Sequence, residues 1–440
     1  MDEYGHIGFF EKVSIASFIA FLASQTYKAL VPEYLGIGID ATLLTAIICI
    51  ASFLLSMIGR NPFRRHQLPV LGFLALYLFM MPVVSLSYAD FTKEYTSYKA
   101  TGVFTLTLFA ATMPVFQVID PTRLRFFLKS FFWIAAIAVG AAELEAISRG
   151  MLQAVNFRVE GFGVNVILLS RIAAGCVLLA FLQLRARDPF ISRSVSITVM
   201  CLLVVAALIT ASRGPFYGMI LIILLFGSTN GGSGSSVKTR LMLLVVIVAA
   251  IAFVLPWATQ FLPEQSAEKI TDASSGVRSD MWLEAIRIIV ANPSGVGFAE
   301  YSSYTSVVAY LGHDYVHNLV LEYFIETGYL GGALLLGMML HLFWVHRPSM
   351  SFSDTYTQVH LLMLYFFLQA LLSADMNGNR LFFAFAAIGL LKPYLFGQMG
   401  HDAASSETAD KTAGSSPGER DTTGALQAGG VPASSIEANR

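Results

Sequence analysis

The sequence consists mostly of apolar runs of about 20 residues, the length that a helix needs to cross the hydrocarbon core of a bilayer. In lipid, each backbone N–H and C=O must find its partner inside the segment, so we expect each run to be helical. The runs fall at residues 13–31, 40–58, 68–87, 101–119, 126–147, 164–183, 195–211, 214–228, 240–256, 318–345, 358–374 and 381–397. The sequence therefore predicts an all-α, polytopic membrane protein with about twelve transmembrane helices.

Composition agrees with this prediction and argues against other classes of protein. Hydrophobic residues make up 55% of the chain and charged residues 13%, whereas a soluble domain has about 25% charged residues. The net charge of −1 gives no basic surface for a nucleic acid. All three cysteines lie inside apolar runs and no CxxC pair occurs, so we predict no disulfide framework, no thiolate metal site and no cysteine nucleophile.

Basic residues in the short loops indicate the orientation of the chain, because cytoplasmic loops carry an excess of Lys and Arg. If the N-terminus is cytoplasmic, most of these residues fall on the cytoplasmic side, with Arg64, Arg65 and Arg123 as examples. Lys93 and Lys99 are among the fewer basic residues that fall on the other side. With an even number of helices, this distribution predicts that both termini are cytoplasmic.

The spacing of the runs divides the chain into four segments. Residues 1–256 hold the first nine helices, 257–317 form one long periplasmic loop, 318–397 hold the last three helices, and 398–440 form a polar tail. The tail is rich in Ala, Gly, Ser, Thr and acidic residues and has almost no large apolar ones. We therefore expect the tail to be disordered in the cytoplasm.

The long loop contains its own short helical pattern. Ser279 and Asp280 offer an N-cap, apolar residues follow at helical spacing, and Asn292 with Pro293 ends the pattern. We expect an amphipathic helix over residues 280–291, which lies on the membrane surface or across the mouth of a cavity.

Two arginines on the predicted periplasmic face are candidate phosphate ligands. Arg213 lies in a tight break between the seventh and eighth runs, and Arg278 comes just before the expected loop helix. The planar guanidinium group suits phosphate oxygens, and a helix N-terminus also favours anions. The alternatives are an interfacial Arg213 that extends towards the headgroups and a solvated Arg278 that pairs with Asp280.

Two histidines lie where the loop enters the tenth run. His317 can take a proton from a sugar hydroxyl, because the pKa of an imidazole is near neutrality. His313 precedes it by four residues, so on a helix the two would share a face and would also suit a metal ion. However, neither an HExxH motif nor a third ligand is nearby, so we predict no metal. The simpler interpretation is a pair of interfacial histidines bonded to the backbone.

Further charged residues lie within or beside the apolar runs. An arginine inside a membrane span is a functional candidate. This applies to Arg171, although an ion pair between Arg171 and Glu143 is an equally good interpretation. Arg380, between the last two runs, is a candidate to line the same cavity. Glu322 and Glu326 follow the second histidine, and they either orient it or cap polar contacts in the helix bundle.

Several of these features occur together as motifs in one order. Ser-Arg-Gly is followed by Arg-x-x-x-Trp, Pro-x-Gly-x-Gly and His-Asn, at residues 212–214, 278–282, 293–297 and 317–318. A longer pattern of His, Asn, nine residues, Gly, two residues and Gly is complete at His317, Asn318, Gly328 and Gly331. The chain therefore resembles the O-antigen ligase/polymerase family, by motif over residues 195–335 and by hydropathy over its whole length.

This resemblance implies a membrane glycosyltransferase at the periplasmic face of a bacterial inner membrane. The implied donor is a glycan linked to undecaprenyl diphosphate, and the implied acceptor is a sugar of lipid A–core or of another glycan. Matched motif by motif, Arg213 and Arg278 would grip the diphosphate and His317 would be the base that activates the acceptor hydroxyl. The implied reaction is inverting and uses neither a metal nor a cofactor. Supporting candidates are His313, Asn318, Glu322, Arg380 and Arg171.

Other functions fit parts of the same pattern. A polymerase of the same superfamily, which joins the repeat units of an O-antigen or exopolysaccharide, shares much of the motif region. A secondary transporter or flippase would explain the helices, but it predicts ionisable residues near the membrane midplane and two related halves. A purely structural membrane subunit gives no reason for the two arginines and the histidine.

Overall fold

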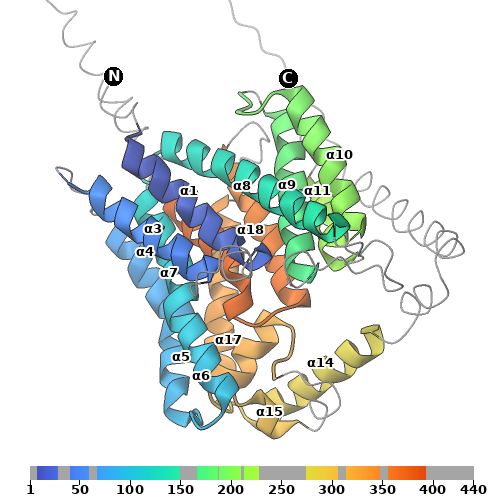
Figure 1. Ribbon diagram of the computed structural model, residues 1–440. Helices are drawn as coiled ribbons and strands as arrows, with labels where there is room; N and C mark the ends of the chain where they lie inside the picture. The colour runs from blue at the N-terminus through green and yellow to red at the C-terminus, as the bar shows by residue number, and fades with distance from the viewer. Residues whose placement is uncertain are drawn as a thin grey trace, which may run out of the picture. The chain divides into compact units, whose positions relative to one another are not determined.

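The computed structural model describes residues 7–27, 40–58, 67–148, 166–186, 188–209, 213–226, 274–305, 314–346 and 355–392. In these residues all regular secondary structure is helical, and no strand occurs (Figure 1). The all-α prediction is therefore confirmed.

The helices follow the predicted apolar runs. The first half of the chain forms α1 (Phe9–Ala23), the turn η1 (Ser24–Thr26), α3 (Ala41–Ser56), α4 (Gln67–Leu74), α5 (Met80–Ser85), α6 (Glu94–Thr101), α7 (Leu108–Gln117), α8 (Pro121–Ser148) and α9 (Val166–Arg185). The second half forms α10 (Arg193–Ile209), α11 (Arg213–Phe226), α14 (Ser274–Ala291), α15 (Tyr301–Tyr304), α17 (Leu319–His346), α18 (Thr355–Leu372) and the turn η7 (Asn377–Asn379). Residues 380–392 are again helical.

Six helical segments in the described ranges are long and apolar enough to cross a membrane. They are Gln67–Tyr88, Glu94–Gln117, Pro121–Glu145, Ile167–Arg185, Leu319–Trp344 and Thr355–Leu372. Shorter apolar helices occupy the predicted runs of α3, α10 and α11. The predicted run at 240–256 and the tail at 398–440 lie outside the described residues. The total of about twelve spans therefore stays a prediction.

The outer faces of these helices are apolar. Leu54 of α3 is 56% exposed, and Leu340 and Trp344 of α17 are 70% and 68% exposed. A soluble protein rarely exposes extended apolar surface, whereas lipid chains favour it. Together with the lengths of the helices, this surface identifies a multi-pass membrane protein.

Inside the bundle, aromatic rings hold three helices together. The ring of Phe385 lies 5.4 Å from that of Phe131 in α8 and 5.4 Å from that of Phe366 in α18. All three side chains are buried. In lipid, close packing of this kind drives helix association, because the surrounding chains are as apolar as the side chains themselves. The contact places α8, α18 and residues 380–392 side by side.

The helix α14 is longer than predicted. It starts by Ser274, so Ser279 and Asp280 lie inside the helix with exposed side chains, and the predicted N-cap is wrong. Ser and Asp are tolerated within a helix where their side chains point to solvent. The predicted end is confirmed, because α14 stops at Ala291. Its buried face packs against α17, so that face is not available to a membrane surface.

A kink at Gly328 attaches a second motif to α17. Gly328 has a φ of 71° inside the helix, which is the left-handed region that favours glycine. The kink frees the carbonyl of Ile325 to accept from the N–H of Val296 at 2.8 Å, and the N–H of Tyr329 donates to the carbonyl of Pro293 at 2.9 Å. The Pro-x-Gly-x-Gly segment is thus bonded through its backbone to α17.

We expect Gly328→Ala to destabilise the protein. The added Cβ would lie 2.5 Å from the carbonyl oxygen of Pro293, and a strained backbone alone costs about 1–3 kcal/mol. The measurement is the midpoint of thermal unfolding in detergent. The matched control is Gly337→Ala in the same helix, whose Cβ would make only an ordinary contact of 3.7 Å with Tyr77. Equal midpoints for the two variants would contradict the prediction.

Candidate active site

His317 stands at the turn that begins α17. Its φ of 57° is one that residues other than glycine seldom adopt. The next residue, Asn318, caps the helix, because its side-chain Oδ1 accepts from the N–H groups of Val320 and Leu321 at 3.1 Å each. The motif asparagine therefore fixes the start of α17 and, with it, the backbone of His317. Strain of this kind is often found at functional sites.

Three rings form a row between α6 and His317. The ring of Tyr95 stacks on that of Tyr315 at 6.3 Å, and the ring of Tyr315 lies 4.3 Å from that of His317. Burial raises the pKa of Tyr315 to about 12, and the negative charges of Asp375 and Glu322 add to the effect. Tyr315 is therefore protonated at neutral pH and keeps a hydroxyl proton to donate near the histidine.

Arg278 approaches the same row from α14. It is half-buried and lies within electrostatic range of Tyr315. Burial lowers the pKa of Arg278, but a guanidinium stays charged at neutral pH. Arg278 and His317 come from separate motifs: the ring of His317 contacts that of Tyr315, and Arg278 lies within electrostatic range of Tyr315.

An ion cluster lies buried next to this row. Lys99 of α6 pairs with both Glu322 and Glu326 of α17. The lysine side chain is 0% exposed and each glutamate side chain 2%. The ammonium also lies 5.1 Å from the ring of Phe298, where the face of an aromatic ring attracts a cation. The cluster joins the first two turns of α17, just after His317, to a helix from the first half of the chain.

Lys99 corrects one sequence prediction. The loop assignment placed it among the basic residues between two spans, but it lies inside α6 and is completely buried. The helix starts at Glu94, seven residues before the predicted run, because buried carboxylates on α17 compensate the lysine. Glu322 and Glu326 therefore hold α6 against α17. The sequence did contain one signal for a buried Lys99, because this lysine comes directly before an apolar run.

Asp375 adds a further acidic group beside Tyr95. Its Oδ2 lies 3.5 Å from the hydroxyl of Tyr95, and its Oδ1 accepts from the N–H of Gly378 at 2.8 Å. Sequence reasoning missed Asp375, Tyr95 and Tyr315. The only sequence signal for these three residues is that they lie near apolar runs and motifs, and this is also true of ordinary interfacial residues.

Arg171 and Arg380 lie close to this site on neighbouring elements. Arg171 donates to the carbonyls of Gln369 at 2.7 Å and Ser373 at 2.6 Å and to Oδ1 of Asn379 at 3.2 Å. The alternative pairing of Arg171 with Glu143 is therefore wrong. Arg171 bonds instead to backbone carbonyls at the end of α18, which have no partner within the helix.

Arg380 bonds within its own turn. Its Nε donates to the carbonyl of Asn377 at 3.2 Å, its Nη2 donates to Oδ1 of Asn377 at 3.1 Å, and its guanidinium lies over the ring of Phe21 at 5.6 Å. Both arginines are buried, at 4% exposure for Arg171 and 6% for Arg380.

The two other candidates are only partly described. Arg213 is the first residue of α11, and its side chain lies outside the described part of the structure, as does the whole of His313. The backbone next to Arg213 is placed: the carbonyl of Gly214 accepts from Nε2 of Gln369 at 3.4 Å. Because Arg171 bonds to the carbonyl of Gln369, the start of α11 lies near Arg171.

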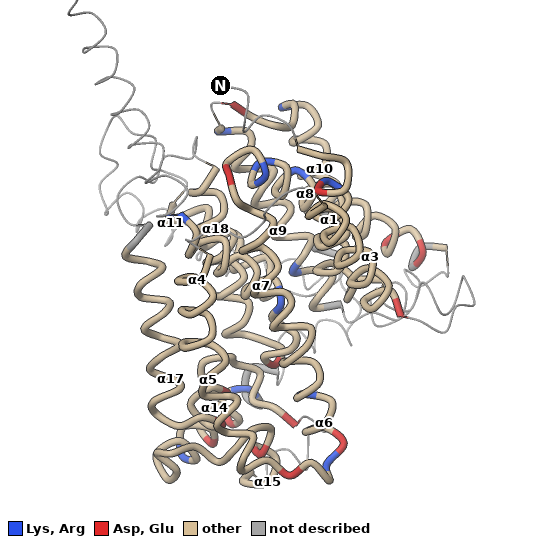
Figure 2. The backbone as a smooth tube through the Cα atoms, turned by 90° about the vertical axis from the view of Figure 1, so that its left-hand side faces the viewer, with Lys and Arg blue, Asp and Glu red and all other residues tan. Residues whose placement is uncertain are grey.

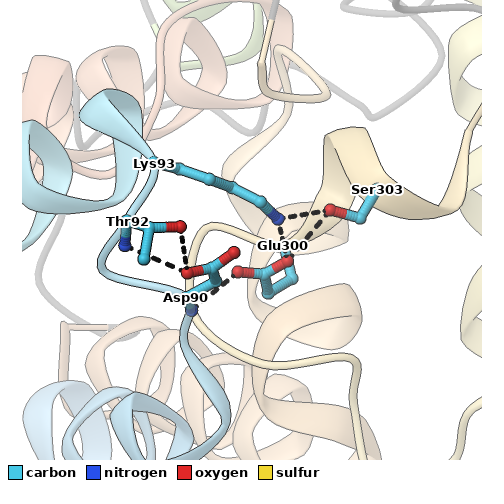
Figure 3. Close-up of polar contacts among 5 residues, drawn as sticks. All are labelled: Asp90, Thr92, Lys93, Glu300 and Ser303. Carbon is cyan, nitrogen blue, oxygen red and sulfur yellow. Dashed lines mark hydrogen bonds and ion pairs between the residues drawn. The ribbon is translucent and has the colours of Figure 1, made fainter.

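A second ion cluster anchors the segment after the Pro-x-Gly-x-Gly motif (Figure 3). Glu300 accepts from the N–H of Asp90 at 2.9 Å and pairs with Lys93. Lys93 also donates to Oγ of Ser303 at 2.5 Å, and Asp90 accepts from Thr92. These contacts tie the segment before α6 to α15. Figure 2 shows charged residues gathered at this end of the helices, while α5 and the middle of α17 carry almost none.

Comparison with known proteins identifies one family. The family model described as O-antigen ligase matches residues 198–336, so the resemblance drawn from the motifs is confirmed. None of the curated proteins matches the chain. The matched segment contains Arg213, Arg278 and His317, whereas Lys99, Arg171 and Arg380 lie outside it.

We expect Lys99→Met to impair folding severely. The change leaves two buried carboxylates without a cation, and breaking a buried ion pair costs about 3–5 kcal/mol. The measurement is the yield of monodisperse protein in detergent. Lys129→Met is the matched control, because Lys129 is exposed on α8. The triple variant Lys99→Met, Glu322→Gln, Glu326→Gln should recover the yield. Normal yield of the single variant would contradict the prediction.

We expect Glu300→Gln to destabilise the protein at neutral pH and much less in acid. Burial favours the neutral acid, but the bonds from Lys93 and the Asp90 N–H outweigh it, so the pKa of Glu300 lies below its ordinary value. Stability from such a group is present above the unfolded-state pKa, about 4.3, and is lost as the pH falls through the folded-state pKa.

The measurement is the difference in unfolding midpoint between Glu300→Gln and wild type at several pH values from 7 downwards. The matched control is Glu284→Gln, which loses only a surface pair with Arg287. A difference that stays constant as the pH falls below about 4 would contradict the prediction.

Proposed function

We propose that this chain, whose residues 198–336 match the O-antigen ligase family model, is a membrane glycosyltransferase. In the proposed reaction it moves a polysaccharide from undecaprenyl diphosphate to a lipid A–core acceptor at the periplasmic face of the inner membrane. The observation that carries the proposal concerns Tyr315: its ring contacts that of His317, and Arg278, from a second motif of the matched domain, lies within electrostatic range of it.

The proposed chemistry is a single displacement. An acceptor hydroxyl attacks the anomeric carbon of the donor sugar while the bond from that carbon to the diphosphate oxygen breaks. Attack from the opposite face inverts the configuration at the carbon. His317 takes the proton of the hydroxyl and later returns it to solvent, a contribution of about 10²–10⁴-fold in rate.

Negative charge builds on the diphosphate as it leaves. Arg278 and Arg213 are proposed to stabilise that charge, because fixed cations in a water-poor site act strongly on charge that develops in the transition state. The half-buried position of Arg278 suits this role. The proposed reaction needs no metal, since the guanidinium groups neutralise the phosphates. The basic loops favour cytoplasmic termini, with the site on the opposite face.

The ion cluster at Lys99 supports the proposal because it holds the helix that begins directly after His317. Glu322 and Glu326 are held by Lys99, so they are not free to act as metal ligands. Their contacts fix the first turns of α17. The N–H of Glu322 also donates to the carbonyl of Asn318 at 2.9 Å. We therefore assign Lys99, Glu322 and Asn318 the role of positioning His317.

A polymerase of the same superfamily is the nearest alternative. It would use the same donor and the same side chains, and its acceptor would be a second lipid-linked glycan. A transporter or flippase is the alternative from another class. The test is therefore reconstitution with a purified undecaprenyl-diphosphate glycan and either core lipid or a second donor as acceptor. Transfer to core lipid identifies a ligase, transfer only to the second donor identifies a polymerase, and solute movement without transfer rejects both.

We expect Arg213→Ala, Arg278→Ala and His317→Ala each to abolish transfer in this assay. The arginine variants lose the charge that stabilises the leaving diphosphate, and the histidine variant loses the base, a fall of about 10²–10⁴-fold in rate. The His317→Ala variant should still bind the donor. Activity should persist in EDTA.

The matched controls are an arginine and a histidine on the same two helices. Arg287 of α14 is an exposed residue whose side chain pairs only with Glu284 among the described ion pairs, and His341 of α17 is exposed near the other end of that helix. Arg287→Ala and His341→Ala should keep activity. Wild-type rates in Arg278→Ala and Arg213→Ala would reject the diphosphate role.

A further inference from the structure

A small, partly open cavity lies between α9, the end of α18 and the turn before residue 380. Its volume is about 10 Å³, the space of roughly one water molecule. Its wall is largely apolar, but five polar or charged residues also line it, namely Arg171, Arg380, Gln25, Gln369 and Asn379. Two arginines therefore line the same small space.

Both guanidinium groups lack a direct counter-ion. Within the described residues, neither Arg171 nor Arg380 lies at ion-pair distance from a carboxylate, and Nε of Arg171 and Nη1 of Arg380 have no hydrogen-bond partner. Asp375 is within electrostatic range of both, but its oxygens bond to Tyr95 and Gly378.

This arrangement differs from that of the other buried cations in the described ranges. Lys99 faces two carboxylates, and Arg123 pairs with Asp120 and Glu11. A buried cation without an anion is strongly unfavourable. Such residues persist inside membrane proteins mainly where they serve a ligand or an ion. Arg171 and Arg380 line one cavity, and each has a nitrogen without a partner, so together they supply both the charge and the donors that an anion requires.

We propose that Arg171 and Arg380 form an anion site that binds a phosphoryl oxygen. The planar guanidinium group matches phosphoryl geometry, and charge-assisted hydrogen bonds to an ionised oxygen are the strongest that these nitrogens can make. A cavity of this size admits one oxygen atom and excludes a sugar ring. The ligand is thus the phosphoryl end of a larger molecule or a small phosphate.

The site adjoins the motif residues. Arg171 lies within electrostatic range of Tyr315, whose ring lies 4.3 Å from that of His317. A phosphoryl group bound to Arg171 and Arg380 would therefore lie beside the proposed transfer site and outside the matched domain. The inference rests on the proposed function in one respect only: that function is the reason to expect that the phosphoryl group belongs to a lipid and is not free phosphate.

The test is binding to the full-length protein in maltoside detergent, which carries no phosphate. The ligands are undecaprenyl phosphate and sodium phosphate, with undecaprenol and sodium chloride at equal ionic strength as their controls. We expect a ligand-dependent rise in unfolding midpoint. Arg171→Gln and Arg380→Gln, which keep hydrogen-bond donors but remove the charge, should each weaken binding about tenfold or more. The matched control is Arg185→Gln, because Arg185 is exposed at the other end of α9.

The variants also give a readout that needs no ligand. Removing a buried charge that has no counter-ion should raise the midpoint of the ligand-free protein for Arg380→Gln, whereas loss of its hydrogen bonds to Asn377 would lower it. A rise in midpoint with undecaprenyl phosphate alone would mean that the site binds the lipid phosphate. A rise with both ligands would mean that it binds a phosphate group whether or not a lipid carries it.

Three results would overturn the proposal: equal shifts with undecaprenol or chloride, shifts that survive in both arginine variants, or a lowered midpoint of ligand-free Arg380→Gln. Because no result depends on glycan transfer, a protein that binds phosphate but transfers nothing would reject only the proposed function. A protein that transfers normally while Arg171→Gln and Arg380→Gln bind unchanged would reject only this site.

Discussion

The packing of this protein depends on one buried lysine between two buried glutamates. A single charge inside a helix bundle costs several kcal/mol, so Lys99, Glu322 and Glu326 are tolerated only in contact with one another. The contact joins α6 to α17 across 227 positions of sequence in the case of Glu326. It also favours one register of the two helices, because a shift of either by one turn would take the ammonium away from one of the two carboxylates.

The candidate site is built outwards from this contact. The cluster holds the first turns of α17, Asn318 caps that helix, and His317 is placed at the strained turn just before it. Three turns into the helix, the Gly328 kink opens the backbone to the Pro-x-Gly-x-Gly segment. The two motifs that are most distinctive in the sequence therefore both attach to α17, and the ion cluster lies between their points of attachment.

The elements around the site come from the whole chain. The matched domain supplies α11, α14 and α17, while the earlier helices supply Tyr95, Lys99 and Arg171. The last described segment supplies Asp375 and Arg380. Three described glutamates of the matched domain, Glu300, Glu322 and Glu326, pair with lysines outside it. The matched domain and the rest of the bundle therefore neutralise each other's buried charges. Only the matched domain carries a recognisable sequence pattern.

Sequence reasoning succeeded where the information is local and failed where it is not. The predicted run at 318–345 became α17 at Leu319–His346, and the run at 164–183 became α9 at Val166–Arg185, since apolar length alone requires a helix in lipid. The start of α14 and the loop assignment of Lys99 were wrong, because a polar residue at the end of a run is helical or not according to what it packs against.

By itself, the sequence determined the helical class, the approximate helix bounds, the family motifs and the candidates Arg278 and His317. Only the tertiary structure decided that Lys99 belongs to Glu322 and Glu326, that Arg171 bonds to α18 and not to Glu143, and that Tyr315 stands between two motifs. The physical reason is that a helix satisfies its backbone within one segment. A buried charge, in contrast, is satisfied only by a side chain or a free carbonyl on a neighbouring helix, and the order of residues does not specify which helices are neighbours.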